Sequence, residues 1–210
     1  MFPDIIENIQ SFEKSFDAIP PNRRNDLNLL SDYFITRRAS NLGIKIIVIC
    51  THNSRRSHMA QLWLAAAAEH YKISDFQTYS GGTEATAFNP NAVGAMRKAG
   101  FDIEGNESLP NPVYGVRWKA IQSSYKAFST KYDDPFNPQS DFVAMMVCQS
   151  ADEACPIVRG MDFRITIEYN DPKAFDNTDL QDAKYSERCL EIGREMCYVM
   201  QRVSVESNCS

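Results

Sequence analysis

The sequence of 210 residues has no long apolar run and no excess of basic residues. No segment approaches the roughly 20 consecutive apolar residues that span a bilayer. The opening MFPDIIENIQ lacks the basic flank and the apolar stretch of a secretion signal. The net charge of -5 argues against a general affinity for nucleic acid, because binding to the phosphate backbone needs clustered Lys and Arg. We therefore expect a cytoplasmic protein that binds neither membranes nor nucleic acid.

Metal-binding patterns are also missing. The chain has only three histidines and no C-x-x-C pair, so we expect no metal and no cofactor. Six cysteines without a secretion signal favour free thiols or catalytic groups over a disulfide framework. Cys50 ends an apolar run, Cys148 and Cys155 flank QSADEA, and Cys189 and Cys197 share a late helical stretch.

The hydrophobic pattern alternates between short apolar runs and helical periodicity. The run Ile44–Ile49 is short and nearly continuous, which is typical of a strand buried on both faces of a parallel sheet. Alternating strands and helices predict an α/β three-layer sandwich with a mainly parallel sheet. The further predicted strands lie near 76–80, 141–147 and 163–168, and the helices near 57–71, 90–99 and 180–202.

Two regions do not fit this alternation. Residues 1–40 predict two helices, near 3–18 and 22–38, which form an N-terminal helical extension to an α/β domain over 41–210. Residues 110–140 contain VYGVRW and YKAFSTKY among Pro, Asn and Asp, so we interpret this region as an inserted hairpin or loop.

The segment CTHNSRRS, residues 50–57, joins the first buried strand to a helix. Open α/β sheets bind ligands at the carboxyl ends of their strands. A short loop at a helix N-terminus directs backbone N–H groups inward and forms an anion cradle. The sequence therefore predicts an oxyanion site that consists of Thr51, His52, Asn53, Ser54, Arg55, Arg56 and Ser57.

Each reactive group in this loop has a predicted role. The inward backbone N–H groups of the loop and the positive end of the helix dipole favour the thiolate of Cys50, which is the nucleophilic form. The planar fork of Arg56 matches two oxygens of a tetrahedral oxyanion. The hydroxyl of Ser57 is able to cap the helix and to hydrogen-bond the Cys50 sulfur. The alternative is a buried structural cysteine followed by two solvated arginines.

The segment CTHNSRRSHMAQLW resembles the phosphate-binding loop and helix of the low-molecular-weight protein tyrosine phosphatases and the thioredoxin-coupled arsenate reductases, which share one fold. The resemblance continues through YSGGTEA and NPNAVGAMRKAGFDI and covers roughly 44–108 and 141–202. His52 stands where this family usually has Gly, and Arg55 where it usually has Cys. Gln61 replaces a Glu that accompanies a potassium site in some reductases, which argues against that cation.

Both branches of this family use a general acid in an Asp-Pro pair after the last strand. Asp171-Pro172 stands at that place, and Asp134-Pro135 is the alternative. The resemblance thus implies that Asp171 protonates the departing oxygen.

Two cysteines decide between the branches. The segment MMVCQSADEACP resembles the redox segment of the reductases, in which one thiol attacks the cysteine–arsenate adduct and another resolves the disulfide for thioredoxin. We therefore expect an arsenate reductase that uses Cys50, Cys148 and Cys155, with arsenate as substrate and thioredoxin as partner. The alternatives are a protein tyrosine phosphatase that hydrolyses phosphotyrosine and a non-catalytic oxyanion- or phosphopeptide-binding module.

Overall fold

A parallel four-stranded sheet forms the centre of the computed structural model, which describes residues 1–121, 124–154 and 157–207. The strand order is β2-β1-β6-β7, and every pairing is parallel. The strands are β1 (Ile44–Cys50), β2 (Phe76–Gly82), β6 (Phe142–Met146) and β7 (Met161–Thr166). The predicted α/β fold class is confirmed, because both central strands, β1 and β6, are almost entirely buried.

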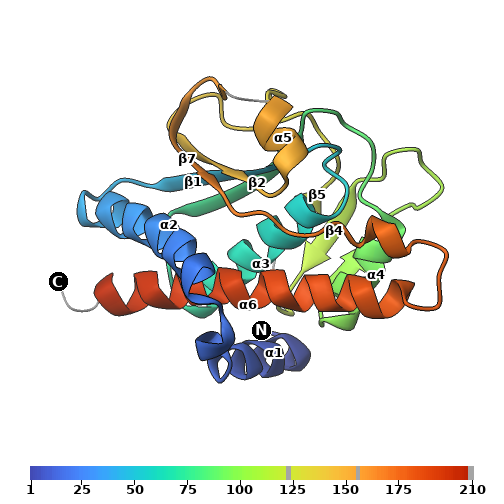
Figure 1. Cartoon of the computed structure of the whole chain (residues 1–210), viewed down its shortest axis with the longest axis horizontal. Coiled ribbons are helices and arrows are strands. Elements are labelled where there is room, and N and C mark those ends of the chain that lie inside the picture. Colours follow the sequence, from blue (N-terminus) through green and yellow to red (C-terminus); the bar gives the residue numbers. More distant parts are fainter. Residues whose placement is uncertain (122–123, 155–156, 208–210) are drawn as a thin grey trace.

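Helices cover both faces of this sheet (Figure 1). On one face lie α3 (Arg56–His70) and the long α6 (Gln181–Ser207), and on the other lies α5 (Gln149–Ala154). The helix α4 (Pro90–Lys98) packs against α6. Buried apolar side chains from β1, α3 and α6 form the main core. None of the helices in the described ranges combines the length and apolar character needed to cross a membrane.

The N-terminal residues form α1 (Pro3–Glu13), the short 3-10 helix η1 (Phe16–Ala18) and α2 (Pro21–Ala39). The sequence predicted one helix through residue 18, but α1 ends at Glu13. The hydroxyl of Ser15 donates to the carbonyls of Ser11 and Phe12 and so competes for groups that a continuing helix would use. Both α1 and α2 pack against α6, which joins these helices to the α/β core.

The region over 110–140 contributes β4 (Tyr114–Arg117) and β5 (Tyr125–Ala127), the two short strands that VYGVRW and YKAFSTKY predict. They pair antiparallel with each other, and β4 also pairs with β3 (Asp102–Glu104), a strand that the sequence pattern did not predict. Beyond β5 the chain returns to the main sheet, where Lys131 forms an isolated parallel bridge with Gly82.

The register of the parallel strands positions the site. β1 and β6 pair with Ile49 opposite Met146, and the Val147 N–H donates to the Ile49 carbonyl. Cys50, the last residue of β1, and Cys148, two residues after the end of β6, therefore lie at the same carboxyl edge of the sheet. The segment after β7 reaches the same edge and continues into the 3-10 helix η2 (Pro172–Phe175).

Candidate active site

The loop between β1 and α3 consists of residues 51–55, and its backbone bends at Asn53, which has a φ of 44°. Asn tolerates this left-handed conformation better than most side chains do. His52 is not among the described residues with positive φ, so the loop does not need a glycine at that position. We call residues 50–57 the anion loop.

Hydrogen bonds connect the Cys50 sulfur to the region that follows β5. Cys50 Sγ lies 3.1 Å from Ser57 Oγ, and Asn53 Nδ2 donates to the same Ser57 oxygen at 2.9 Å. The Thr130 N–H in turn donates to Asn53 Oδ1 at 2.8 Å. Because Ser57 accepts from Asn53, its own proton is free to point at the Cys50 sulfur.

Neighbouring segments hold the backbone of the anion loop. The Glu84 N–H donates to the Thr51 carbonyl at 2.8 Å, and the Asn89 N–H donates to the Ser54 carbonyl at 2.9 Å. The His52 carbonyl accepts from Ser129 Oγ at 3.2 Å. These contacts leave the loop little freedom to change shape.

Arg56 lies at the first position of α3, and its guanidinium points toward the segment after β7. Nη1 donates to the Tyr169 carbonyl at 2.8 Å, and Nη2 donates to Asp171 Oδ2 at 2.7 Å. The buried Nε has no hydrogen-bond partner among the described residues. An oxyanion on the loop would give this N–H an acceptor, as the predicted clamp requires.

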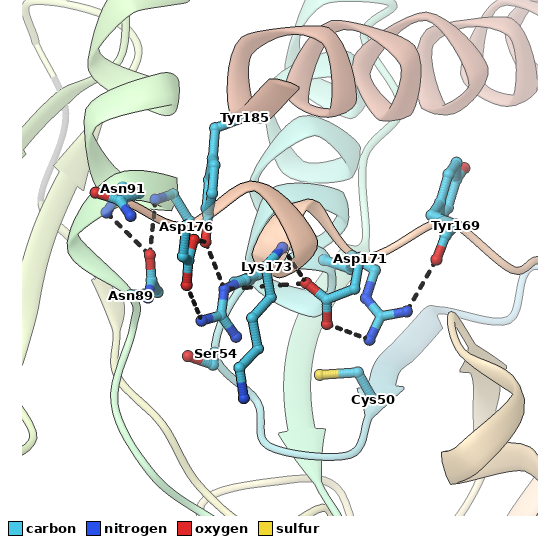
Figure 2. A network of polar contacts seen from close by, with 12 residues as sticks. Cys50, Ser54, Asn89, Asn91, Tyr169, Asp171, Lys173, Asp176 and Tyr185 are labelled. Atoms are coloured by element: carbon cyan, nitrogen blue, oxygen red, sulfur yellow. Dashed lines mark hydrogen bonds and ion pairs between the residues drawn. The ribbon is translucent and has the colours of Figure 1, made fainter. Parts of the chain in front are cut away.

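Asp171, the predicted general acid, thus lies beside the anion loop (Figure 2). Its Oδ1 accepts the Lys173 N–H at 3.0 Å and so caps η2. Asp134, the alternative, accepts the Phe136 N–H at 2.9 Å within its own turn. The position next to Arg56 supports Asp171 as the acid.

Arg55 turns away from Arg56 and bonds to other elements. Its Nε donates to Tyr185 Oη at 2.7 Å, and its Nη2 donates to Asp176 Oδ2 at 3.4 Å. The same Nε lies 3.9 Å from Asp171 Oδ1. The side chain is 12% exposed and is held in place, not solvated.

Cys148 lies next to the anion loop, since Thr51 Oγ1 and Cys148 Sγ are 3.4 Å apart. Both residues line a cavity of about 810 Å³ together with His52, Arg56 and Asp171. The second predicted redox thiol, Cys155, falls outside the described residues.

The N-terminal helices contribute to the wall of this cavity. Arg23 of α2 pairs with the buried Glu195 at 2.9 Å and donates to the Glu168 carbonyl at 2.8 Å. Tyr169 donates its hydroxyl proton to Glu195 at 2.6 Å. The backbone segment that accepts from Arg56 is therefore anchored to both α2 and α6.

Two buried polar side chains near the loop, His58 and Gln61, form hydrogen bonds, although His58 Nε2 and Gln61 Oε1 have no partner among the described residues. Burial lowers the pKa of His58 to about 4, and its Nδ1 lies 3.2 Å from Ser80 Oγ. The amide of Gln61 donates to the Tyr125 hydroxyl at 3.1 Å. Within the described residues, no group of three His, Cys, Asp or Glu side chains is placed to hold a metal.

Sequence reasoning missed several residues that bond to the site, among them Thr130, Asp176 and Tyr185. Thr130 acts through its backbone N–H, which leaves no signature in a sequence. The signal for the other two was Arg55 itself, because an arginine next to a buried strand end needs a carboxylate or another acceptor.

The fold and the site define an α/β protein with a C-x5-R loop between a central strand and a helix. Residues 45–113 match the family described as low molecular weight phosphotyrosine protein phosphatase. Arsenate reductase 2 of Staphylococcus epidermidis is 34% identical over 113 residues, which cover 54% of this chain and 66% of that protein, just under two thirds. The chain is therefore similar, over part of its length, to the low-molecular-weight phosphotyrosine protein phosphatases and to arsenate reductases.

Further comparisons point to the same similarity. The arsenate reductase of Bacillus licheniformis is 46% identical over 63 residues, which cover 30% of this chain and 42% of that protein. The crystal structure of a YwlE mutant from Bacillus subtilis has a TM-score of 0.50 and 14% identity, and it covers 79% of this chain and 99% of that one. At this identity the structural likeness shows the fold alone.

Proposed function

We propose that this protein is a cysteine-dependent oxyanion enzyme of the arsenate reductase type that works in the cytoplasm. The observation that carries the proposal is the position of Cys148 beside the anion loop, 3.4 Å from the hydroxyl of Thr51. A phosphatase needs no second thiol there, whereas a reductase must bring one to the sulfur of the nucleophile.

In the first step the Cys50 thiolate attacks the arsenic of arsenate. A sulfur–arsenic bond forms, the bond from arsenic to a hydroxyl group of hydrogen arsenate breaks, and that hydroxyl leaves as water after it takes a proton from Asp171. Arg56 binds two of the remaining oxygens, and the loop N–H groups stabilise their charge. Arsenic remains in its +5 state in this adduct.

In the second step the Cys148 thiolate attacks the Cys50 sulfur. The electron pair of the sulfur–arsenic bond passes to arsenic, which leaves as arsenite in the +3 state, and a Cys50–Cys148 disulfide forms. Cys155 then attacks the Cys148 sulfur and releases Cys50 as a thiolate. A dithiol protein of the thioredoxin type returns the Cys148–Cys155 disulfide to two thiols.

A tyrosine phosphatase is the second candidate, and the observation that favours it is the Asp171 carboxylate 2.7 Å from Arg56. Cys50 would attack phosphorus, Asp171 would protonate the leaving phenol, and water would hydrolyse the cysteinyl phosphate. A non-catalytic module that binds oxyanions or phosphopeptides needs the loop but neither of these reactions.

A side-by-side assay tests these candidates. Purified protein is given arsenate or an aryl phosphate, each with and without thioredoxin and its reductase. We expect arsenite formation over many turnovers that depends on thioredoxin and is lost in Cys148→Ser and Cys155→Ser, while Cys50→Ser loses every activity. Aryl phosphate turnover without arsenite would establish the phosphatase instead, and no turnover of either compound would leave the binding module.

A further inference from the structure

Three hydrogen bonds close a ring around Arg55. Its guanidinium donates to Tyr185 of α6 and to Asp176, and Tyr185 Oη donates to Asp176 Oδ1 at 2.7 Å. The ring joins the anion loop, the long helix and the residue that ends η2. We call Arg55, Asp176 and Tyr185 the anchor triad.

The segment 171–176 is thus attached to the anion loop at both of its ends. At one end Asp171 pairs with Arg56, and at the other Asp176 is held by the anchor triad. Figure 2 shows Asp171 above Cys50, with Asp176 and Tyr185 on one side of it and Tyr169 on the other.

The two attachments behave differently when a substrate binds. Arg56 must turn its N–H groups to the oxyanion, and the Nη2 that now donates to Asp171 is one of them. Asp171 must also leave Arg56 in order to give a proton to the departing oxygen. The Arg56 attachment is therefore exchanged during the reaction, whereas the anchor triad remains and holds the segment together with the packing of η2 against α6.

We propose that Tyr185 and Asp176 are positioning residues that, by holding Arg55, keep the Asp171-bearing segment against the anion loop after an oxyanion has displaced Asp171 from Arg56. This role rests on the proposed function, because it assigns the proton transfer to Asp171. It also explains what Arg55 does at the position where the family usually has cysteine.

The charges of the triad suit this task. Burial and the hydrogen bond to Asp176 raise the pKa of Tyr185, so its hydroxyl keeps the proton that it donates. Asp176 balances the charge of Arg55, which therefore does not compete with Arg56 for the oxyanion. Tyr185 is almost fully buried on α6, a helix packed against four others, so its hydroxyl has a fixed position.

Hydrogen–deuterium exchange of the segment 171–178, with and without saturating inorganic phosphate, tests the proposal. In the wild type the Asp176 N–H, which donates to the Lys173 carbonyl, should stay protected in both conditions. In Tyr185→Phe it should stay protected without phosphate, because the Asp171–Arg56 pair remains. With phosphate it should exchange about tenfold faster, as expected for the loss of a hydrogen bond to a charged group.

A leaving-group series gives an independent measurement. Tyr185→Phe should lower kcat for phenyl phosphate about tenfold more than for p-nitrophenyl phosphate, because only the poorer leaving group depends strongly on the acid. The control is Tyr198→Phe. It also removes a tyrosine hydroxyl from α6, but that hydroxyl donates to Asn28 and not to Asp176. The control should match the wild type in both experiments, and Asp176→Asn should reproduce the effect of Tyr185→Phe.

The outcomes separate this proposal from the proposed function. Phosphate must first slow the alkylation of Cys50 in the wild type, and its failure to do so would contradict the oxyanion site itself. If phosphate protects Cys50, but exchange in Tyr185→Phe is equal with and without phosphate, the positioning role is wrong. Equal losses for both aryl phosphates would also overturn it and would assign the triad to fold stability alone.

Discussion

At the scale of single residues, the environment of Cys50 distinguishes it from the other described thiols. Ser57 lies 3.1 Å from its sulfur, and the N-terminus of α3 begins six residues further on. Burial instead raises the pKa of Cys189 to about 12 and raises that of Cys197 as well. These two thiols pack in the core, and at Cys189 burial outweighs the hydrogen bond that the Trp63 indole donates to its sulfur.

Cys50 should therefore react first with iodoacetamide at pH 6, where the thiols of Cys189 and Cys197 remain protonated. Peptide mapping after partial alkylation measures the order of reaction. Phosphate, arsenate or sulfate should slow the labelling of Cys50 only. An equal rate at Cys50 and Cys189 would contradict the assignment of the nucleophile.

Arg56→Lys should lower kcat/KM by at least about tenfold although it keeps the charge, since an ammonium cannot donate two parallel hydrogen bonds to an oxyanion. Steady-state kinetics with aryl phosphate or arsenate measures the loss. Arg97→Lys is the control, because Arg97 bonds to the Ile103 carbonyl outside the cavity. Comparable losses in the two variants would remove Arg56 from the oxyanion clamp.

At the scale of elements, the end of β2 shapes the anion loop. A Cβ at Gly82 would lie 2.7 Å from the Asn53 nitrogen and 2.8 Å from the Thr51 carbonyl oxygen, closer than backbone atoms allow. The glycine pair in YSGGTEA thus lets the strand end approach the loop.

Gly82→Ala should displace the loop and weaken phosphate binding by at least about tenfold, as expected when one or more loop hydrogen bonds are lost. Isothermal titration with inorganic phosphate measures the change. Gly94→Ala in α4 is the matched control, since no atom lies within 4 Å of its added Cβ. Unchanged phosphate affinity in Gly82→Ala would show that the loop does not need this close approach.

Much of the element order could be predicted from the sequence, and the exceptions have physical causes. The run Ile44–Ile49 predicts β1 well because a strand buried on both faces needs a continuous apolar run. The short β3 was not predicted, since three residues are too few to show a period. The ring of Arg55, Asp176 and Tyr185 joins residues 121 and 130 positions apart, a contact that no local pattern encodes.

At the scale of the whole molecule, the N-terminal helices are part of the structure that supports the site. Arg23 of α2 stacks over the Tyr169 ring at 4.5 Å and pairs with Glu195, which is only 2% exposed. Tyr169 also accepts from Arg56 through its carbonyl. The α2 helix, the α6 helix and the segment after β7 thus meet behind the anion loop.

The stability of the whole molecule should depend on pH through His58. Its folded pKa of about 4 lies below the unfolded value of 6.5, so the unfolded chain binds more protons between these values. The contribution of neutral His58 to the free energy of unfolding is therefore fully present above pH 6.5 and decreases as the pH falls toward 4. From His58 alone, the free energy of unfolding should be about 2 kcal/mol lower at pH 5 than at pH 7.

Urea unfolding at both pH values measures this difference. The variant His58→Gln, which keeps a polar group beside Ser80 but cannot be protonated, should lose most of the His58 contribution. If the variant and the wild type have the same pH dependence, His58 is not a neutral buried group.

The central claim is that Cys50 and Cys148 reduce a bound oxyanion together. A single turnover with arsenate and no external reductant tests it most directly, because two electrons from one pair of thiols reduce one arsenate. The account predicts one arsenite per protein molecule, the loss of two thiols, and a Cys148–Cys155 disulfide in the mass spectrum. No arsenite and all thiols free, in a protein that still hydrolyses an aryl phosphate, would contradict it.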